Sequence, residues 1–134
     1  LPLVKCYSGQ LNQAFMNLLA NAIDALDESN EGKTYGEIQK NPNVITIRTS
    51  ADEDKVTIRI ADNGPGMTEE VRNKLFNAFF TTKPEGKGTG LGLSISYQIV
   101  TEKHGGNLYC ISSPGNGAEF VIELPLEADL EDED

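Results

Sequence analysis

The sequence of 134 residues lacks several features that mark large classes of protein. Its longest apolar runs are only a few residues, so no segment can span a bilayer, and no signal peptide is visible. Basic residues are few, 11 Lys and Arg against 21 Asp and Glu, and they form no stripe of the kind that nucleic acid requires. We therefore set aside nucleic acid and anionic membranes as partners.

Cysteine and histidine are scarce as well. Cys6 and Cys110 stand alone without CxxC spacing, which favours reduced, partly buried thiols in an intracellular protein. The one histidine, His104, lies at the end of an expected helix in "EKHGG", where a positive charge suits the helix dipole. We interpret His104 as a residue that belongs to the helix end.

The remaining composition is that of one globular domain, with 38% hydrophobic and 24% charged residues. The net charge of −10 is uneven, because the last eight residues, "EADLEDED", carry six acids and no base and leave −4 for the rest (−10 minus −6). We expect a domain at residues 1–126 and an acidic tail or linker at residues 127–134. The chain opens "LPLVKCY" without Met, which indicates a fragment of a longer protein.

Hydrophobic periodicity predicts an α+β fold, a two-layer sandwich in which helices back a mixed, mostly antiparallel sheet. A long helix is expected over about residues 9–26 with Ser8 as its N-cap, a short one over 69–76 after Thr68, and a third over about 90–103. Residues 27–43 are predicted to form a polar surface loop. Strands are expected at residues 2–7, 44–50, 55–62, 107–113 and 118–125.

Polar residues form one stripe on the long helix. Gln13, Asn17 and Asn21 are four residues apart and Asp24 follows three later, within an otherwise apolar segment. These side chains are either boundary residues that loops or water satisfy, or an oxygen-rich site for a hard cation such as Mg²⁺.

The motif "ADNGPGM" ends the strand at residues 55–62. Asp62 is either the brace of a tight turn or a buried acceptor for an exocyclic amine such as that of adenine. Gly64 and Gly66 permit positive φ angles or the close approach of a ligand to the backbone.

The segment "KPEGKGTGLGLS" alternates glycines at residues 86, 88, 90 and 92 directly before a helix. Such a segment can wrap around phosphate oxygens at a helix N-terminus and act as a lid, and Lys83 and Lys87 are natural charge partners for a polyphosphate. Its spacing matches neither GxxxxGK[ST] nor GxGxxG, so it is neither a P-loop nor a dinucleotide-binding turn.

Four segments in order, "NLLANAIDAL", "DNGPGM", "FNAFFTTK" and "GKGTGLGLS", resemble the N, first glycine, F and second glycine boxes of the sensor histidine kinase ATP-binding domain. That domain belongs to the superfamily of gyrase, MutL and the heat-shock chaperones, and the resemblance covers about residues 3–125. It implies ATP and Mg²⁺ as cofactors, with Asn21 and Asn17 at the metal and Asp62 on the adenine amine. The other cofactor-binding residues that it implies are Asp24, Ala25, Gly64, Gly66, Met67, Thr82, Lys83, Lys87, Gly88, Thr89, Gly90, Leu91, Gly92 and Leu93.

Two positions depart from the family pattern. Asp24 and Ala25 stand where many kinases of the family have Lys or Arg followed by Tyr, so the lid lysines must carry more of the phosphate charge. Ala118 stands where the family's last strand usually has a Thr that holds a water beside adenine. Phe76 is expected to pin the lid to the core, and Phe79 or Phe80 to dock against partner helices.

In this family the γ-phosphoryl of ATP passes to a histidine on a separate dimerisation hairpin and then to the receiver domain of a response regulator. We expect that hairpin as the partner, no catalytic residue and no phosphoacceptor within this chain, a monomeric fragment, and a cytoplasmic location whether or not the parent protein is anchored in a membrane. The alternatives are an ATP-gated clamp of the chaperone or MutL type, a degenerate nucleotide-binding module, and a serine kinase. Gln13 and Asn17 occupy the places where a clamp would carry its catalytic Glu.

Overall fold

The computed structural model describes residues 1–78, 80 and 91–127, and they form two layers. One layer is a four-stranded sheet in the order β1-β2-β4-β3. Its strands are β1 (Ile45–Ala51), β2 (Lys55–Asp62), β3 (Asn107–Ser112) and β4 (Ala118–Pro125). Every neighbouring pair is antiparallel, so the mixed sheet that we expected is purely antiparallel within the described residues.

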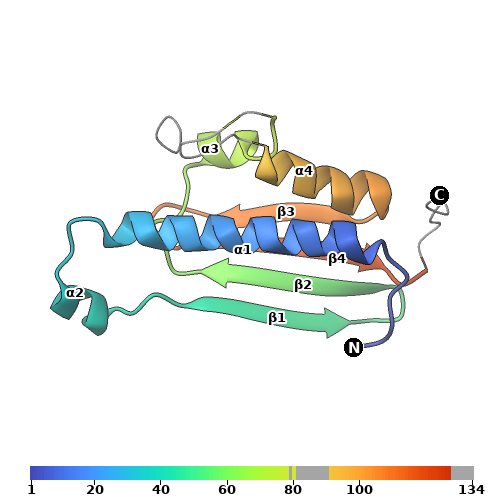
Figure 1. Cartoon of the computed structure of the whole chain (residues 1–134), viewed down its shortest axis with the longest axis horizontal. Coiled ribbons are helices and arrows are strands. Elements are labelled where there is room, and N and C mark those ends of the chain that lie inside the picture. Colours follow the sequence, from blue (N-terminus) through green and yellow to red (C-terminus); the bar gives the residue numbers. More distant parts are fainter. Residues whose placement is uncertain (79, 81–90, 128–134) are drawn as a thin grey trace.

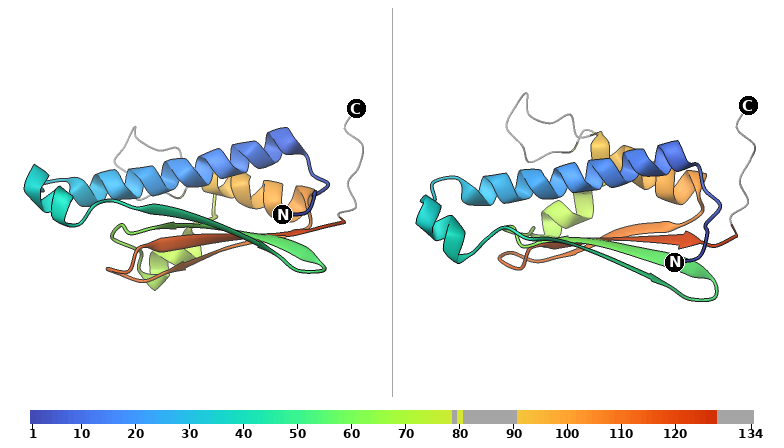
Figure 2. Two further views of the ribbon diagram at one scale, coloured as in Figure 1. Left: turned by 90° about the horizontal axis from the view of Figure 1, so that it is seen from below. Right: turned by 60° about the horizontal axis from the view of Figure 1, so that its bottom comes forward.

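The second layer consists of two helices that lie side by side on one face of the sheet (Figure 1). They are α1 (Ser8–Asn30) and α4 (Gly92–Gln98), and α4 continues as a π-helical turn, η1 (Ile99–Lys103). Both views in Figure 2 show α1 running along the strands. Two short helices, α2 (Tyr35–Lys40) and α3 (Glu69–Lys74), lie in the connections.

The core fills the space between the helices and the sheet. Residues of α1 at helical spacing are buried, and alternate residues of β4 meet them from the sheet. Phe76 stacks on Tyr97 with ring centroids 5.0 Å apart and meets the edge of Phe120 at 6.3 Å, which confirms its role as an anchor to the core. The buried cluster comprises Leu11, Ala14, Leu18, Ile60, Leu75, Ile99, Val100, Leu108, Phe120, Ile122 and Leu124.

The opposite face of the sheet carries charged side chains in alternate positions. Arg59 and Glu119 form an ion pair of 2.7 Å, as do Lys55 and Glu123. These pairs are partly exposed and contribute little stability, so the fold depends on the face that the helices cover.

Three expectations about the elements were wrong. Residues 2–7 form no strand: Leu1 and Leu3 are exposed, and the Tyr7 N–H bonds to a side chain rather than to a neighbouring strand. The expected loop contains α2, because the Thr34 hydroxyl caps it by accepting the Glu37 N–H and also donates to the Glu37 carboxylate. Ser8 is the first helical residue of α1, whose N-cap Tyr7 makes no side-chain capping hydrogen bond, and the helix runs to Asn30.

The other helix ends agree more closely with the sequence. The Thr68 hydroxyl caps α3 by accepting the Val71 N–H at 3.3 Å. The third helix ends near residue 103 as expected, but its last turn is π-helical. Gly105, with φ of 66°, ends it in an αL motif, since the Gly105 N–H bonds to the Thr101 carbonyl, and the Gly106 N–H bonds to that of Val100.

Candidate functional site

The polar stripe on α1 lies between the two helices and the loop after β2. Asn17, Asn21, Asp24 and Ala25 are all half-buried, whereas Gln13, which precedes them on the stripe, is exposed. The stripe is therefore partly enclosed from Asn17 onward and open to solvent at Gln13.

Asparagine 17 joins α1 to the beginning of α4. Its Nδ2 donates to the Gly92 carbonyl at 3.2 Å, and the Ser96 hydroxyl donates to the same carbonyl at 2.8 Å. Because the Asn17 amide nitrogen is engaged by Gly92, its carbonyl oxygen remains as the acceptor for a ligand. A Cβ on Gly92 would lie 3.8 Å from the Asn17 side chain, an ordinary van der Waals distance, so the start of α4 packs beside Asn17.

Aspartate 62 is buried at the end of β2, with 8% of its surface exposed. Its Oδ1 accepts the Gly64 N–H at 2.9 Å, which is the brace of a tight turn, and the backbone N–H of Ala118 donates to the same carboxylate. A Cβ on Gly64 would lie 2.9 Å from that Oδ1 and 3.5 Å from the Cβ of Ala25. The glycine thus brings the Asp62 turn against α1, and the interpretation of Asp62 as the brace of a tight turn is confirmed.

The turn that follows is held by the hairpin between β3 and β4. Met67 N–H donates to the Ser112 hydroxyl at 2.9 Å, and that hydroxyl donates to the Gly117 carbonyl at 2.6 Å. Gly66 has a φ of 74°, and a Cβ there would lie 2.1 Å from the Ser113 carbonyl oxygen. Gly117 has a φ of 66°, and a Cβ there would lie 2.1 Å from the Asp62 carbonyl oxygen.

Burial determines the electrostatics of this region. Desolvation raises the pKa of Asp62, and the N–H groups of Gly64 and Ala118 oppose that shift only in part. Desolvation, together with the charge of Asp62, also raises the pKa of the Cys110 thiol to about 12. Both cysteines are free and half-buried, as expected.

The predicted set divides into three segments that the structure brings together and one that it does not describe. Gly92, between Leu91 and Leu93 at the start of α4, contacts Asn17 of the α1 stripe, and the Asp62 turn meets Ala25. Thr82, Lys83, Lys87, Gly88, Thr89 and Gly90 lie outside the described residues, as does Phe79. Phe80 is half-buried.

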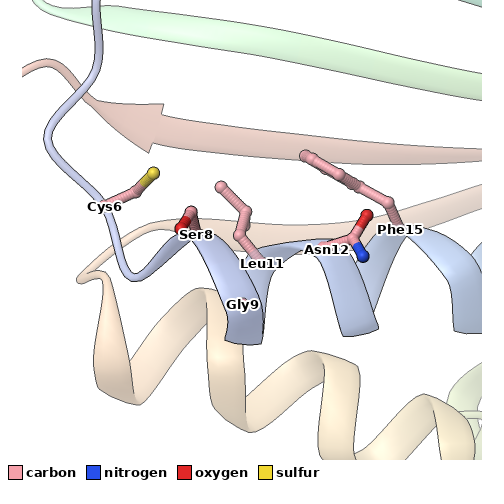
Figure 3. Close-up of a pocket in the computed structure, with 6 residues that line it drawn as sticks. All are labelled: Cys6, Ser8, Gly9, Leu11, Asn12 and Phe15. Carbon is pink, nitrogen blue, oxygen red and sulfur yellow. The ribbon is translucent and has the colours of Figure 1, made fainter.

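An open hollow of about 560 Å³ lies elsewhere, at the amino-terminal end of α1 (Figure 3). None of its lining residues was predicted to bind a ligand. They are Cys6, Ser8, Gly9, Leu11, Asn12 and Phe15.

Sequence reasoning missed the residues that support Asp62 from the opposite hairpin. Ser112 connects Met67 to Gly117, and the Arg72 guanidinium donates to the Ser112 carbonyl at 3.3 Å. The glycines of "SSPGNG" were the available signal, since two of them have positive φ.

Two helices cover one face of an antiparallel sheet. An amide stripe, a buried carboxylate and a glycine-rich helix start lie between the layers. This arrangement is that of an ATPase domain of the α+β sandwich type. Residues 7–128 match the family described as histidine kinase-, DNA gyrase B- and HSP90-like ATPase, and the chain belongs to that family.

The relatives narrow this assignment to the sensor kinases. Sporulation kinase E of Bacillus subtilis is 36% identical over 98% of this chain, and sensor kinase CckA of Brucella abortus is 40% identical over 91%. The chain spans only 16% and 13% of their lengths. These relatives do not favour the clamp of the chaperone or MutL type.

Solved structures agree. The catalytic domain of histidine kinase ThkA has a TM-score of 0.71 and 33% identity, over 92% of this chain and 71% of that one. The mycobacterial sensor histidine kinase MprB has a TM-score of 0.72 and 28% identity, over 93% and 78%. The described residues include no helix with the length and apolarity needed to cross a bilayer.

Proposed function

We propose that this domain binds Mg·ATP between α1, the Asp62 turn and the start of α4, and donates the γ-phosphoryl to a histidine on a separate helical hairpin. The observation that carries the proposal is the buried Asp62 carboxylate, braced by Gly64 and set against Ala25 of α1. A carboxylate offers roughly four acceptor sites, so two backbone bonds leave capacity for the adenine amine. Met67 and Ala25 would pack against the ring.

The amide oxygens of Asn17 and Asn21 fit a magnesium ion. The Gly92 carbonyl accepts a hydrogen bond from the amide nitrogen of Asn17 and so orients the Asn17 side-chain oxygen. Asn21 lies one turn further along the same helix. Among residues 1–78, 80 and 91–127, no group of three or more His, Cys, Asp and Glu side chains is arranged to hold a metal. Mg²⁺ would therefore be bound by amide oxygens, phosphates and water, where it supplies neutralisation of phosphate charge.

The start of α4 suits the phosphates. The first intrahelical bond runs from the Ile95 N–H to the Leu91 carbonyl, so the N–H groups of Gly92 and Leu93 precede the helical ladder. The lid residues Thr82, Lys83, Lys87, Gly88, Thr89 and Gly90 are proposed to complete the phosphate contacts.

The acceptor histidine must lie outside this chain. His104 is 3% exposed and both of its ring nitrogens are hydrogen-bonded, so it cannot reach a nucleotide. We propose the hairpin of the parent protein as direct partner and a response regulator receiver domain as the indirect one, with the domain in the cytoplasm. Phosphoryl transfer needs mainly positioning and charge neutralisation, so no general base from this chain is required.

Thermal melting with ATP, ADP and GTP, each with and without Mg²⁺, tests the proposal. Ligand at about a hundred times its dissociation constant adds roughly 2.7 kcal/mol, which corresponds to a rise of around ten degrees. We expect an adenine-selective, Mg²⁺-enhanced rise that Asp62→Ala abolishes. If no nucleotide raises the melting temperature, the domain is a degenerate binding module and the proposal of kinase activity is refuted.

A further inference from the structure

His104 is the most completely enclosed polar ring in the described part of the chain, with 3% of its surface exposed. Its Nε2 lies 2.9 Å from the Tyr7 backbone nitrogen, and its Nδ1 lies 2.8 Å from the Ile99 carbonyl oxygen. Because the Tyr7 N–H can only donate, Nε2 must accept, and Nδ1 then carries the proton that Ile99 receives. The ring is therefore held by one hydrogen bond on each nitrogen, and His104 is the C-cap of η1, which confirms its interpretation as a helix-end residue.

The two partners of His104 lie on different helical segments, Tyr7 at the start of α1 and Ile99 at the junction of α4 and η1. Tyr7 is the N-cap of α1, and its carbonyl accepts the Leu11 N–H at 2.9 Å, so the residue that His104 holds also begins the helix. No side chain caps α1 at that point, and the Tyr7 ring meets the imidazole edge at 5.4 Å. The entry of α1 is thus oriented by a residue 97 positions away in the sequence.

The Ile99 bond fixes the other side of the junction. Ile99 opens the π-helical turn η1, whose geometry occurs often at functional positions. A Cβ on Gly106 would lie 2.1 Å from the Glu123 carbonyl oxygen, so the end of η1 rests directly on β4. The imidazole consequently joins the entry of α1 to a helix end that is seated on the sheet.

The same two helices are joined again at the nucleotide end, by the Asn17 bond to the Gly92 carbonyl. Between these two links run the seven residues of α4 and the five of η1, about 18 Å at 1.5 Å per residue. A shift of Gly92 when a ligand binds would therefore be transmitted along α4 to its far end, where His104 accepts the Tyr7 N–H.

We infer that His104 is a positioning residue that couples occupancy of the nucleotide site to the docking of residues 1–7 at the entry of α1. The inference rests on the proposed function, since the ligand is Mg·ADP or Mg·ATP at Asn17 and Asp62. In the nucleotide-bound state the Tyr7 N–H stays on Nε2, and when that bond opens the start of α4 loses part of its alignment with Asn17. The docking of residues 1–7 therefore changes with the occupancy of the nucleotide site.

Amide hydrogen exchange of Tyr7, measured with and without saturating Mg·ADP, tests the coupling. In the wild-type chain we expect Mg·ADP to slow Tyr7 exchange about fivefold or more, the lower range of allosteric coupling. In His104→Asn the amide nitrogen can still donate to Ile99 but nothing accepts from Tyr7, so the protection disappears. Linkage requires the affinity for ADP to fall by the same factor.

Two variants separate coupling from simple structural support. His104→Gln can place Oε1 near the position of Nε2, and we expect it to restore much of the protection. Thr101→Val removes a hydroxyl bond of 2.7 Å to the Tyr97 carbonyl in the same turn, and we expect the coupling to survive. If Mg·ADP binds the wild-type chain and leaves Tyr7 exchange unchanged, the inference is overturned whatever the variants do. If Mg·ADP does not bind, the proposed function fails instead.

Discussion

The substitution Asp62→Asn is predicted to stabilise the empty domain while weakening its binding of nucleotide. The folded pKa of Asp62 is raised by burial, so this group favours the folded state only when it is protonated. Its contribution is fully present below the unfolded pKa of a carboxyl and is lost as the pH rises through the folded pKa. At neutral pH the ionised Asp62 therefore lowers the free energy of unfolding, and an uncharged Asn does not.

The local hydrogen bonds also favour a higher free energy of unfolding for Asp62→Asn. The carbonyl oxygen of Asn can accept the Gly64 N–H as Oδ1 does now at 2.9 Å, so the turn keeps its brace, and the weakened interaction with the Ala118 N–H is smaller than the desolvation that Asn relieves. The Asn amide nitrogen would then face the adenine amine, where two donors meet. Loss of one hydrogen bond to a charged group is worth about 1.5–3 kcal/mol, so the affinity for ADP should fall roughly 10- to 150-fold.

Denaturant titrations of both chains, from neutral pH toward the carboxyl range, measure the stability effect. Asp62→Asn should be the more stable chain at pH 7, and the difference should shrink as the pH falls. Calorimetric titration with Mg·ADP measures the second effect. A variant that is less stable at pH 7, or one that binds ADP as the wild type does, would refute the reasoning.

Three further predictions concern neighbouring residues. Ala118→Thr supplies the hydroxyl that the family usually has, so ATP should bind tighter by about 1 kcal/mol; unchanged affinity in a titration would contradict this. Cys110, whose pKa burial raises to about 12, should be alkylated by iodoacetamide at pH 8 far more slowly than Cys6, followed by mass spectrometry, and equal rates would contradict the burial argument. Gly117→Ala should lower the melting temperature well beyond Gly115→Ala. Both glycines have positive φ, so each substitution should lower the free energy of unfolding by about 1–2 kcal/mol. Of the two, Gly117 is the one where the added Cβ would also lie 2.1 Å from the Asp62 carbonyl oxygen. Equal losses would show that this contact relaxes at no cost.

Local patterns were sufficient to predict most elements of the fold. The alternation in residues 44–50 and 55–62 and the Thr68 cap are short-range signals, and the structure confirms them. The helix α2 was missed although "TYGE" begins with an N-cap threonine, because its surroundings are polar and turn-forming. The strand at residues 2–7 was predicted wrongly because the position of Tyr7 is set by His104, through a contact with no local signature.

The candidate site divides in the same way. Asn17, Asp62 and Gly92 stand in motifs that the sequence displays directly, and the structure places them on adjoining elements. The support of the Asp62 turn by Ser112 and Gly117 depends on strand pairing across 45 residues and more. Such contacts follow from the sheet order, and periodicity within one segment does not predict them.

The measurement that tests the central claim most directly is phosphoryl transfer from γ-labelled ATP to the histidine-bearing hairpin of the full-length protein, supplied separately. The account predicts a label on histidine, stable to base and labile to acid, that requires Mg²⁺ and is absent with Asp62→Ala, while Gly115→Ala retains it. A chain that binds Mg·ATP in the melting assay but transfers no label to the hairpin would contradict the assignment of this domain as the kinase.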